Sequence, residues 1–308
     1  TSVYFPGFVV PMLPEKLSNK VCSLRPNEEK LCFSAVFTMN SKAEILNEWF
    51  GRTVIYSNHR FAYEDAQKVI EQKEGVFKEE ILFMDMLAKK MRMRRIKEGA
   101  ITFDRVEVKF QLDEKYNPKG VYFKQAKDAN KLIEEFMLLA NKKVARFIGR
   151  SQDGKASKKP FVYRVHDIPD PEKISTFSTF VKQFGHSVDV NNSKEIAHSM
   201  NRILSDVDGK PEENMVELLA IRTMSKAKYT VDNIGHYGLG FDYYTHFTSP
   251  IRRWPDVMVH RLLQKYLDGE TNHDKIKIEE QCKHSSSMEK LSTDAERASI
   301  KYMQVKYL

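Results

Sequence analysis

The segment 235–263 concentrates the side chains best suited to phosphate chemistry. Ser249 is a typical N-cap residue and Pro250 suits the first position of a helix, so we expect a helix to begin here. Arg252 and Arg253 would then lie in its first turn, where a guanidinium group and the outward-pointing backbone N–H groups can address the same phosphate. Spacing alone leaves a second interpretation open, in which the arginines pair with nearby acids.

Metal ligands are the other common requirement of phosphoryl chemistry, and the sequence offers no compact set of them. Two-metal catalysis needs several carboxylates around ions about 4 Å apart. The nearest acidic pairs are Asp167 with Asp170, at an expected helix start, and Asp206 with Asp208, in a turn that contains Gly and Pro. We expect structural roles for both pairs. Zinc is not expected, because the histidines of the segment 235–263 are ten and fourteen residues apart.

The formal net charge of +8 is unevenly distributed along the 308 residues. Residues 87–97, the first basic segment, hold six basic residues and no acid, and residues 141–165, the second basic segment, hold eight basic residues and one acid. Together they carry +13, while the rest of the chain sums to −5. One such run is ordinarily the solvated face of a helix end, but two favour a polyanionic partner. Charge alone does not distinguish RNA, DNA and an anionic membrane.

The remaining composition indicates a folded protein in a reducing compartment. Hydrophobic residues make up 41% and charged residues 30% of the chain, a balance typical of globular proteins. Apolar runs stay well short of the roughly 20 residues that cross a bilayer, and no signal peptide is visible, so no membrane partner is expected. The three cysteines lack a Cys-x-x-Cys pair, which favours a cytoplasmic location over a disulfide framework.

The elements that must position these side chains change in character along the chain. Alternating apolar residues predict β-hairpins at 31–57 and 106–124, and helical spacing predicts helices at 63–73 and 78–97. Beyond residue 128 we expect mostly helices, at 128–149, 171–184, 193–204, 211–226 and 274–308, with a short strand at 161–165. The sequence therefore predicts an α+β fold in which a mixed β-sheet or barrel-like core in the first half packs against a helix-rich second half.

The final predicted helix carries a regular apolar stripe. Its members recur at helical spacing and are Met288, Leu291, Ala295, Ala298, Tyr302 and Val305. A stripe of this kind is typical of a helix face that packs on the body of a domain. We therefore expect a packing role and not a binding site.

The segment 235–263 resembles the signature of the RNB family, the catalytic domain of ribonuclease II and ribonuclease R. The resemblance is carried by His246-Phe-Thr-Ser-Pro-Ile-Arg-Arg253, with Gly235-His-Tyr-Gly-Leu before it and Asp256 and His260-Arg261 after it. It extends over the whole chain, and the ribonuclease R branch is the more similar. Further matching stretches are Tyr4-Phe-Pro-Gly, Val10-Pro-Met-Leu-Pro-Glu-Lys-Leu-Ser18, Tyr163-Arg-Val-His-Asp167 and Ala295-Glu-Arg-Ala298.

The resemblance implies a 3′-to-5′ exoribonuclease that hydrolyses single-stranded RNA with Mg²⁺ and releases nucleoside 5′-monophosphates. The arginine matching Arg252 is expected to stabilise charge on the scissile phosphate, and the glutamate matching Glu296 is expected to lie near the reaction centre. Family members carry their metal-binding aspartates in an acidic motif upstream of the residues that resemble Tyr4. We therefore expect residues 1–308 to be one RNB domain that starts after this motif, without cold-shock or S1 domains, weak or inactive by itself and monomeric.

The RNA-binding residues implied by the resemblance fall into three groups. Tyr4 and Phe103 match aromatic residues that clamp stacked bases at the 3′ end, a contact that tolerates any sequence. Tyr63 and Glu134 match positions that touch the sugar and favour ribose, so DNA is not expected as a partner. The motif residues His246, Ser249 and Arg253 are also expected to contact RNA.

Each of these assignments has a structural alternative. Tyr4 could be a strand-edge aromatic, Phe103 a core residue, and Glu134 and Glu296 acids on helix surfaces. Trp254 also replaces the tyrosine that more usually follows the double arginine in the family. At the level of the protein, two alternatives stay open: a non-catalytic RNA-binding or scaffold member of the same family, and a DNA-binding protein that uses the same basic segments.

Overall fold

The computed structural model describes residues 1–103, 106–151, 153–271 and 273–308. Within these residues the strands form four two-stranded antiparallel sheets. The pairs are β1 (Val3–Phe5) with β2 (Phe8–Val10), β3 (Glu29–Met39) with β4 (Ile45–Tyr56), β5 (Val106–Leu112) with β6 (Pro118–Gln125), and β7 (Tyr163–Val165) with β8 (Lys228–Thr230). The α+β class is confirmed, and its β part consists of these small sheets.

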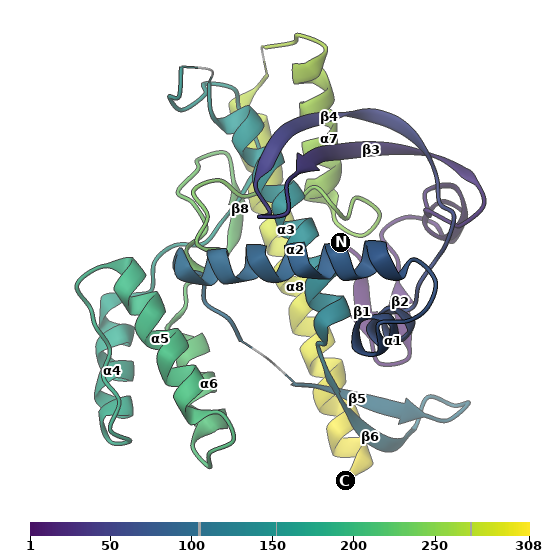
Figure 1. The fold of residues 1–308 in the computed structure, drawn as a ribbon. Helices are drawn as coiled ribbons and strands as arrows, with labels where there is room; N and C mark the ends of the chain where they lie inside the picture. The colour runs from purple at the N-terminus through teal and green to yellow at the C-terminus, as the bar shows by residue number, and fades with distance from the viewer. Residues whose placement is uncertain (104–105, 152, 272) are drawn as a thin grey trace.

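Helices dominate the second half of the chain, as Figure 1 shows. The α-helices of the described residues are, in chain order, α1 (Tyr63–Gln72), α2 (Lys78–Lys97), α3 (Asp128–Gly149), α4 (Pro171–Lys182), α5 (Ser193–Val207), α6 (Glu213–Thr223), α7 (Trp254–Leu267) and α8 (Lys275–Tyr307). Two shorter turns of helix cover Lys16–Val21 and Tyr237–Leu239. None of the helices among the described residues is both long and apolar enough to span a membrane.

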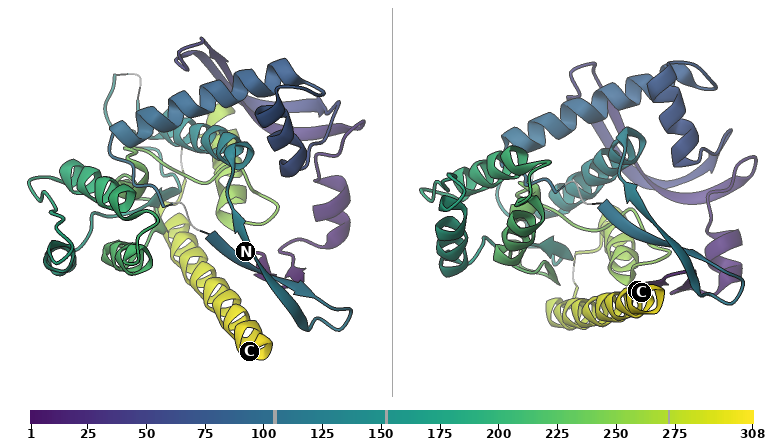
Figure 2. Two further views of the ribbon diagram at one scale, coloured as in Figure 1. Left: turned by 60° about the horizontal axis from the view of Figure 1, so that its bottom comes forward. Right: turned by 90° about the horizontal axis from the view of Figure 1, so that it is seen from below.

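The main hydrophobic core lies where α3, α7 and the first half of α8 meet the β3–β4 hairpin. Val144 of α3, Leu263 of α7 and Cys282 of α8 are fully buried in it, together with Phe161. Helices α4, α5 and α6 enclose a second cluster and form a separate group at one side of the molecule (Figures 1 and 2). The site described below is built on the elements of the main core.

The start of α7 differs from the sequence-based expectation. The chain makes only a turn at Pro250–Arg252, Arg253 is extended with φ −133° and ψ 122°, and α7 begins at Trp254. A helix running on from Pro250 is disfavoured because Pro255 lacks the N–H that would bond to the carbonyl of Ile251, and its ring would clash there. The prediction of a helix opening at Ser249 was therefore wrong, and Arg252 lies in the turn that precedes α7.

The apolar stripe of α8 also differs from expectation. Met288 is 38% exposed, Leu291 63%, Tyr302 62% and Val305 66%, whereas Ile278, Cys282 and Ser285 are buried. The first half of α8 packs on β8 and α7, and its second half extends alongside β1 and β6, towards the C-terminus in Figure 2. The prediction that the stripe packs on the body was wrong, because the distal part of the helix has few elements to cover it.

Candidate active site

Asp256 fastens the turn that carries the double arginine. Its carboxylate is fully buried in the first turn of α7 and accepts hydrogen bonds from the backbone N–H of Ser249 (2.7 Å) and from Nη2 of Arg253 (3.0 Å). Nε of Arg253 lies 2.9 Å from the second carboxylate oxygen. Arg253 therefore fits the interpretation in which an arginine pairs with a nearby acid, and its charge is balanced inside the fold.

Arg252 has a different environment from Arg253. Its side chain is exposed, and it forms no ion pair with any residue that the structure describes. The backbone carbonyl of Arg252 accepts hydrogen bonds from the N–H of Ser2 and from Oγ1 of Thr1, both at 3.0 Å. The turn is thus held from two sides, by Asp256 and by the start of the chain, while the Arg252 guanidinium stays available for an anion.

Glu296, on α8, is hydrogen-bonded to strand β1, which begins just after the Ser2 contact with the arginine turn. Its Oε1 accepts a 2.8 Å hydrogen bond from the backbone N–H of Tyr4, and the hydroxyl of Ser292 lies 3.5 Å from that oxygen and 3.4 Å from the carbonyl of Ser2. Strand β1 therefore lies between the arginine turn and α8. The structure brings Tyr4, Arg252 and Glu296 into one neighbourhood, although Glu296 is 292 residues from Tyr4.

The Tyr4 ring is free to stack on a partner. The side chain is 44% exposed at the outer edge of the β1–β2 hairpin, while its backbone is fixed by Glu296. A rigidly mounted, exposed aromatic ring is well suited to base stacking, because little conformational entropy is lost on contact.

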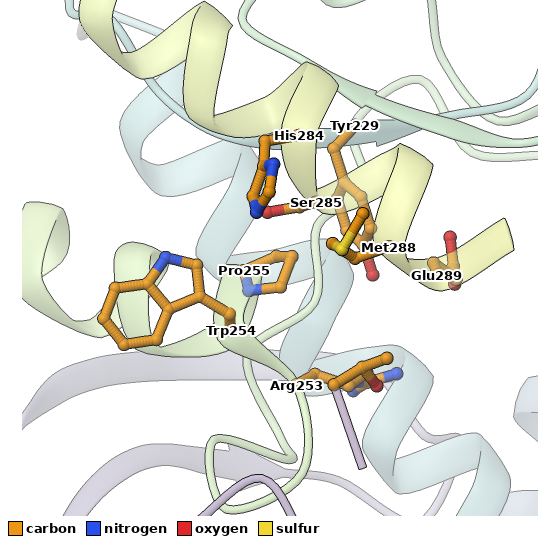
Figure 3. A pocket seen from close by; sticks show the side chains of 9 residues that line it. Tyr229, Arg253, Trp254, Pro255, His284, Ser285, Met288 and Glu289 are labelled. Atoms are coloured by element: carbon orange, nitrogen blue, oxygen red, sulfur yellow. The ribbon is translucent and has the colours of Figure 1, made fainter. Parts of the chain in front are cut away.

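A cavity of about 240 Å³ adjoins the arginine turn. Figure 3 shows Trp254 and Pro255 on one side of it and His284, Ser285 and Met288 of α8 on the other. The lining is mostly apolar, with further contributions from Thr1, Tyr229, Arg253 and Glu289.

A buried polar network supports the turn from behind. The Tyr229 hydroxyl and Nδ1 of His246 lie 2.7 Å apart, and Arg164 covers the Tyr229 ring at 4.5 Å. Arg164 also makes two hydrogen bonds to the carboxylate of Glu289, at 2.5 and 3.0 Å. Burial, reinforced by the charge of Arg253, holds the pKa of His246 well below its usual range, so this imidazole is neutral. His246 and Ser249 thus hold structural positions beside the exposed Arg252.

Helix α3 fixes the path of the motif segment through one buried amide. Asn141 donates to the Tyr244 hydroxyl (3.2 Å) and accepts from the backbone N–H of Phe247 (2.9 Å). The buried hydroxyl of Thr245 donates to the carbonyl of Val162 (2.6 Å). These bonds satisfy buried polar groups that would otherwise be costly, and they set the register between α3 and the arginine turn.

The other residues expected from the sequence lie on different elements. Tyr63, the first residue of α1, is 45% exposed, and Glu134 is exposed on α3 with one oxygen 3.6 Å from Arg95. Helices α1 and α3 pack together, which places both residues in one helical layer. Phe103 is partly buried against the cluster of α4, α5 and α6. Among the described residues, Tyr63 and Glu134 form no hydrogen bond or ion pair with Arg252 or Glu296.

Sequence reasoning assigned no role to several residues that build the site. Ser2, Ser292 and Glu289 make hydrogen bonds between segments far apart in the chain, and single polar residues of this kind have no periodic signature. Asp256 did have a sequence signal, because it stands in the stretch that resembles the RNB signature, three residues after Arg253, its ion-pair partner.

The metal expected from the family resemblance was tested against the donor groups present. Among the described residues, no three His, Cys, Asp or Glu side chains lie close enough together to hold an ion. The Glu296 carboxylate is engaged by the Tyr4 N–H, and the Asp256 carboxylate by Arg253 and the Ser249 N–H. These residues do not form a metal site by themselves.

Comparison with known families assigns this geometry to a class. The RNB domain model matches residues 1–269, so the chain belongs to the RNB domain family. Within that family it is similar to ribonuclease R of Aquifex aeolicus, with 36% identity over 314 residues that cover 99% of this chain and 44% of the relative. The chain thus spans less than half the length of that relative.

Solved structures agree with this assignment. RNase R of Mycoplasma genitalium in complex with ribose-methylated single-stranded RNA superposes with a TM-score of 0.88 at 28% identity, covering 99% of this chain and 49% of that chain. The same enzyme in complex with double-stranded RNA gives a TM-score of 0.87, covering 99% and 56%. Yeast Ssd1, described as a pseudonuclease, shares the fold with a TM-score of 0.77 at 21% identity, covering 97% and 37%.

Proposed function

We propose that the protein containing this chain is a ribonuclease R-like 3′-to-5′ exoribonuclease that acts on single-stranded RNA. The observation that carries the proposal is the exposed Arg252, which has no ion pair among the described residues and lies in a turn bonded to Thr1 and Ser2, next to the strand that joins Tyr4 to Glu296. Family membership and the RNA complexes of a similar RNase R support it. The products would be nucleoside 5′-monophosphates.

The proposed roles follow from the chemistry of each side chain. The guanidinium of Arg252 can donate two parallel hydrogen bonds to phosphate oxygens and stabilise the charge that develops there during hydrolysis. The ring of Tyr4 can stack on a base near the 3′ end whatever its sequence. Glu296 holds Tyr4 in place through the backbone and brings a carboxylate to the same site. Asp256 and Arg253 are positioning residues, because they act on Arg252 through the turn.

Several finer features of the function stand as proposals. Mg²⁺ dependence rests on the family, with ligands expected upstream of Thr1. Residues 1–308 would form one RNB domain, act as a monomer and reside in the cytoplasm. Tyr63 and Glu134 would favour ribose, and Phe103 would complete the base clamp with Tyr4. Tyr63 and Glu134 are exposed on α1 and α3, where an RNA strand could approach. Phe103 follows α2 and is partly buried.

The proposal is tested by product analysis. A single-stranded RNA labelled at its 5′ end is incubated with Mg²⁺ and either the 308-residue chain or the same chain extended upstream through the expected acidic motif. We expect shortening from the 3′ end and release of 5′-mononucleotides by the extended protein, and little hydrolysis by the shorter chain. Equal rates for the two would contradict the placement of the metal ligands. Tight RNA binding without hydrolysis by the extended protein would favour the non-catalytic alternative.

Competition between RNA and DNA oligomers of one sequence tests the choice of nucleic acid. We expect RNA to bind more tightly, and Tyr63→Phe to reduce that preference, because a hydroxyl near the sugar end is what can sense the 2′-OH. Equal affinities of RNA and DNA for the unmodified protein would favour the DNA-binding alternative and would remove the roles given to Tyr63 and Glu134.

The distal part of the second basic segment needs a separate test. Lys155 lies 3.8 Å from Asp153, and Lys159 covers the Tyr266 ring at 5.1 Å, so local structure accounts for both. Charge reversal at Lys155, Lys158 and Lys159 should flatten the dependence of RNA affinity on salt if this loop contacts phosphates. An unchanged slope would show that the loop only faces water.

A further inference from the structure

The two basic segments meet at one cavity away from the arginine turn. Helix α2 carries residues 87–97 and helix α3 carries the start of residues 141–165, and these helices pack against each other. Between them and the β3–β4 turn lies a cavity of about 300 Å³. Its lining includes Arg94 of α2 and Lys142 and Arg146 of α3. The sequence separates these cations by about fifty residues, and the fold brings them together.

Lys142 is a partly buried cation without an acidic partner. Its Nζ lies 4.4 Å from the centre of the Phe241 ring, and it makes no ion pair with any side chain in the described ranges. Burial lowers the pKa of Lys142; the charges of Glu98 and Asp242 act in the opposite direction, and those of Arg146 and Lys143 add to the lowering. Taking an ammonium group out of water is costly unless an anion or several acceptors compensate. A bound anion would supply that compensation.

Two cations close to Lys142 differ from it, because each of them has an acidic partner. Lys143, the next residue, pairs with Glu48 at 2.7 Å, and Arg95 is buried against Glu135. Arg146, one helical turn after Lys142, is exposed and likewise has no ion pair within the described part of the chain. Lys142 and Arg146, one turn apart on one helix face, therefore have no ion pair among the described residues, whereas Lys143 and Arg95 each pair with an acid.

Arg94 completes the cationic side of the cavity. Its guanidinium donates to the backbone carbonyls of Lys42 (3.0 Å) and Ala43 (3.3 Å), which fixes it against the β3–β4 turn without neutralising its charge. The acids in the lining are Glu44, which accepts from Asn40 at 2.6 Å, Glu98 and Glu135. The five basic lining residues outnumber these three acids, so the cavity is net positive. Met91 and Leu139 give it apolar walls.

We propose that this cavity is a second phosphate-binding site, in which Lys142, Arg146 and Arg94 bind the phosphate group of a nucleotide and the apolar walls contact its uncharged part. The phosphate would come from a free mononucleotide or from the backbone of an RNA strand. The site shares no residue with the Arg252 turn, so it does not depend on hydrolysis there.

Binding by isothermal titration calorimetry tests the proposal with three probes: inorganic phosphate, adenosine 5′-monophosphate and a single-stranded RNA oligonucleotide. The variant Lys142→Met/Arg146→Gln removes two charges from the cavity, and Lys173→Gln/Lys182→Gln is a matched control that removes two charges from exposed positions on α4, outside both basic segments. Circular dichroism and the melting temperature verify that both variants fold. Arg252→Gln, combined with each, keeps binding at the arginine turn from contributing.

We expect the cavity variant to bind the monophosphate roughly tenfold more weakly than the control, because each lost contact is a charge-assisted hydrogen bond. A parallel loss of oligonucleotide affinity would identify the RNA backbone as a source, and unchanged oligonucleotide affinity would identify the free nucleotide. Equal affinities of the two variants for all three probes would overturn the proposal. The proposed exonuclease activity would be unaffected by that result, since it is measured at Arg252.

Discussion

The backbone N–H of Tyr4 donates a 2.8 Å hydrogen bond to Oε1 of Glu296. This contact attaches the first strand of the chain to its last helix, beside the turn that carries Arg252. The exposed Tyr4 ring and the Glu296 carboxylate are therefore coupled through main-chain geometry. A shift of α8 at Glu296 would be transmitted to Tyr4, although the two residues look independent in the sequence.

Replacing Glu296 separates its structural role from its chemical role. Glu296→Gln retains an oxygen that can accept from Tyr4, so we expect a melting temperature near that of the unmodified protein and a lower rate of RNA hydrolysis. Glu296→Ala removes the acceptor and should destabilise the protein by about 1–2 kcal/mol. Asp294→Ala, an exposed acid on the same helix, is the control and should change neither quantity. Equal stability of the alanine and glutamine variants would show that the Tyr4 contact is not formed in solution.

Removal of Asp256 should damage the fold more than removal of any surface acid. Asp256→Ala leaves Arg253 and the Ser249 N–H without their buried partner, and breaking such a pair costs about 3–5 kcal/mol. Asp268→Ala, at the exposed end of the same helix, should change stability by less than about 0.5 kcal/mol. Urea unfolding monitored by circular dichroism measures both. A loss below about 1 kcal/mol for Asp256→Ala would be inconsistent with its role in fastening the turn.

Stability should fall as the pH drops from about 7.5 to 5.5. Burial lowers the pKa of His236 to about 3, with His166 and Arg164 adding to the effect, and it also lowers the pKa of His166 and His246. Unfolded histidine has a pKa of about 6.5, so below that pH the unfolded state binds more protons and is favoured, by up to about 1.4 kcal/mol per pH unit for each histidine.

The variant His236→Gln tests this pH dependence, because it removes one of the neutral, buried imidazoles. Its free energy of unfolding, measured in urea at pH 7.5 and 5.5, should change less between the two pH values than that of the unmodified protein. Any loss of stability common to both pH values does not enter the comparison. The assignment would be refuted by an identical pH dependence in the two proteins.

Tyr4→Ala should weaken binding of single-stranded RNA by about 1–3 kcal/mol, irrespective of sequence, because stacking uses only the face of the ring. Tyr4→Trp should retain affinity. Tyr56→Ala is the control, since Tyr56 is similarly exposed (54%) but lies on β4, away from the arginine turn. Fluorescence anisotropy with two RNA sequences provides the measurement. A loss confined to one sequence, or equal losses for Tyr4 and Tyr56, would exclude the stacking role.

The sequence predicted the regular elements with good accuracy where strong local signals coincide. Helices α2 and α3 have the expected bounds, and Asp170 caps α4 by accepting from the N–H of Glu172, with Pro171 as the first helical residue. The hairpins β3–β4 and β5–β6 follow their alternating patterns. In each of these places propensity, capping and hydrophobic period favour the same structure, so no tertiary contact was needed to decide it.

Predictions that depended on one local signal were less successful. Ser249 was expected to cap a helix, but Pro255 disfavours a helix that runs through residues 250–255. The buried carboxylate of Asp256 also accepts from the Ser249 N–H, and the helix starts at Trp254. The stripe on α8 has the correct period, yet burial depends on which elements lie nearby. The bonds from Ser2 to Arg252 and from Tyr4 to Glu296 join the two ends of the chain, and spacing carries no information about them.

Arg252 is proposed to act on the scissile phosphate, and single-turnover hydrolysis tests this role most directly. The natural full-length protein and its Arg252→Gln variant are mixed in excess with a 5′-labelled single-stranded RNA and Mg²⁺, and the rate of 3′ shortening is compared with the RNA affinity. We predict a rate at least about 100-fold lower in the variant, as expected for loss of a charge-stabilising group, with a much smaller change in affinity. A variant that shortens RNA at the rate of the unmodified protein would contradict the assignment of this site.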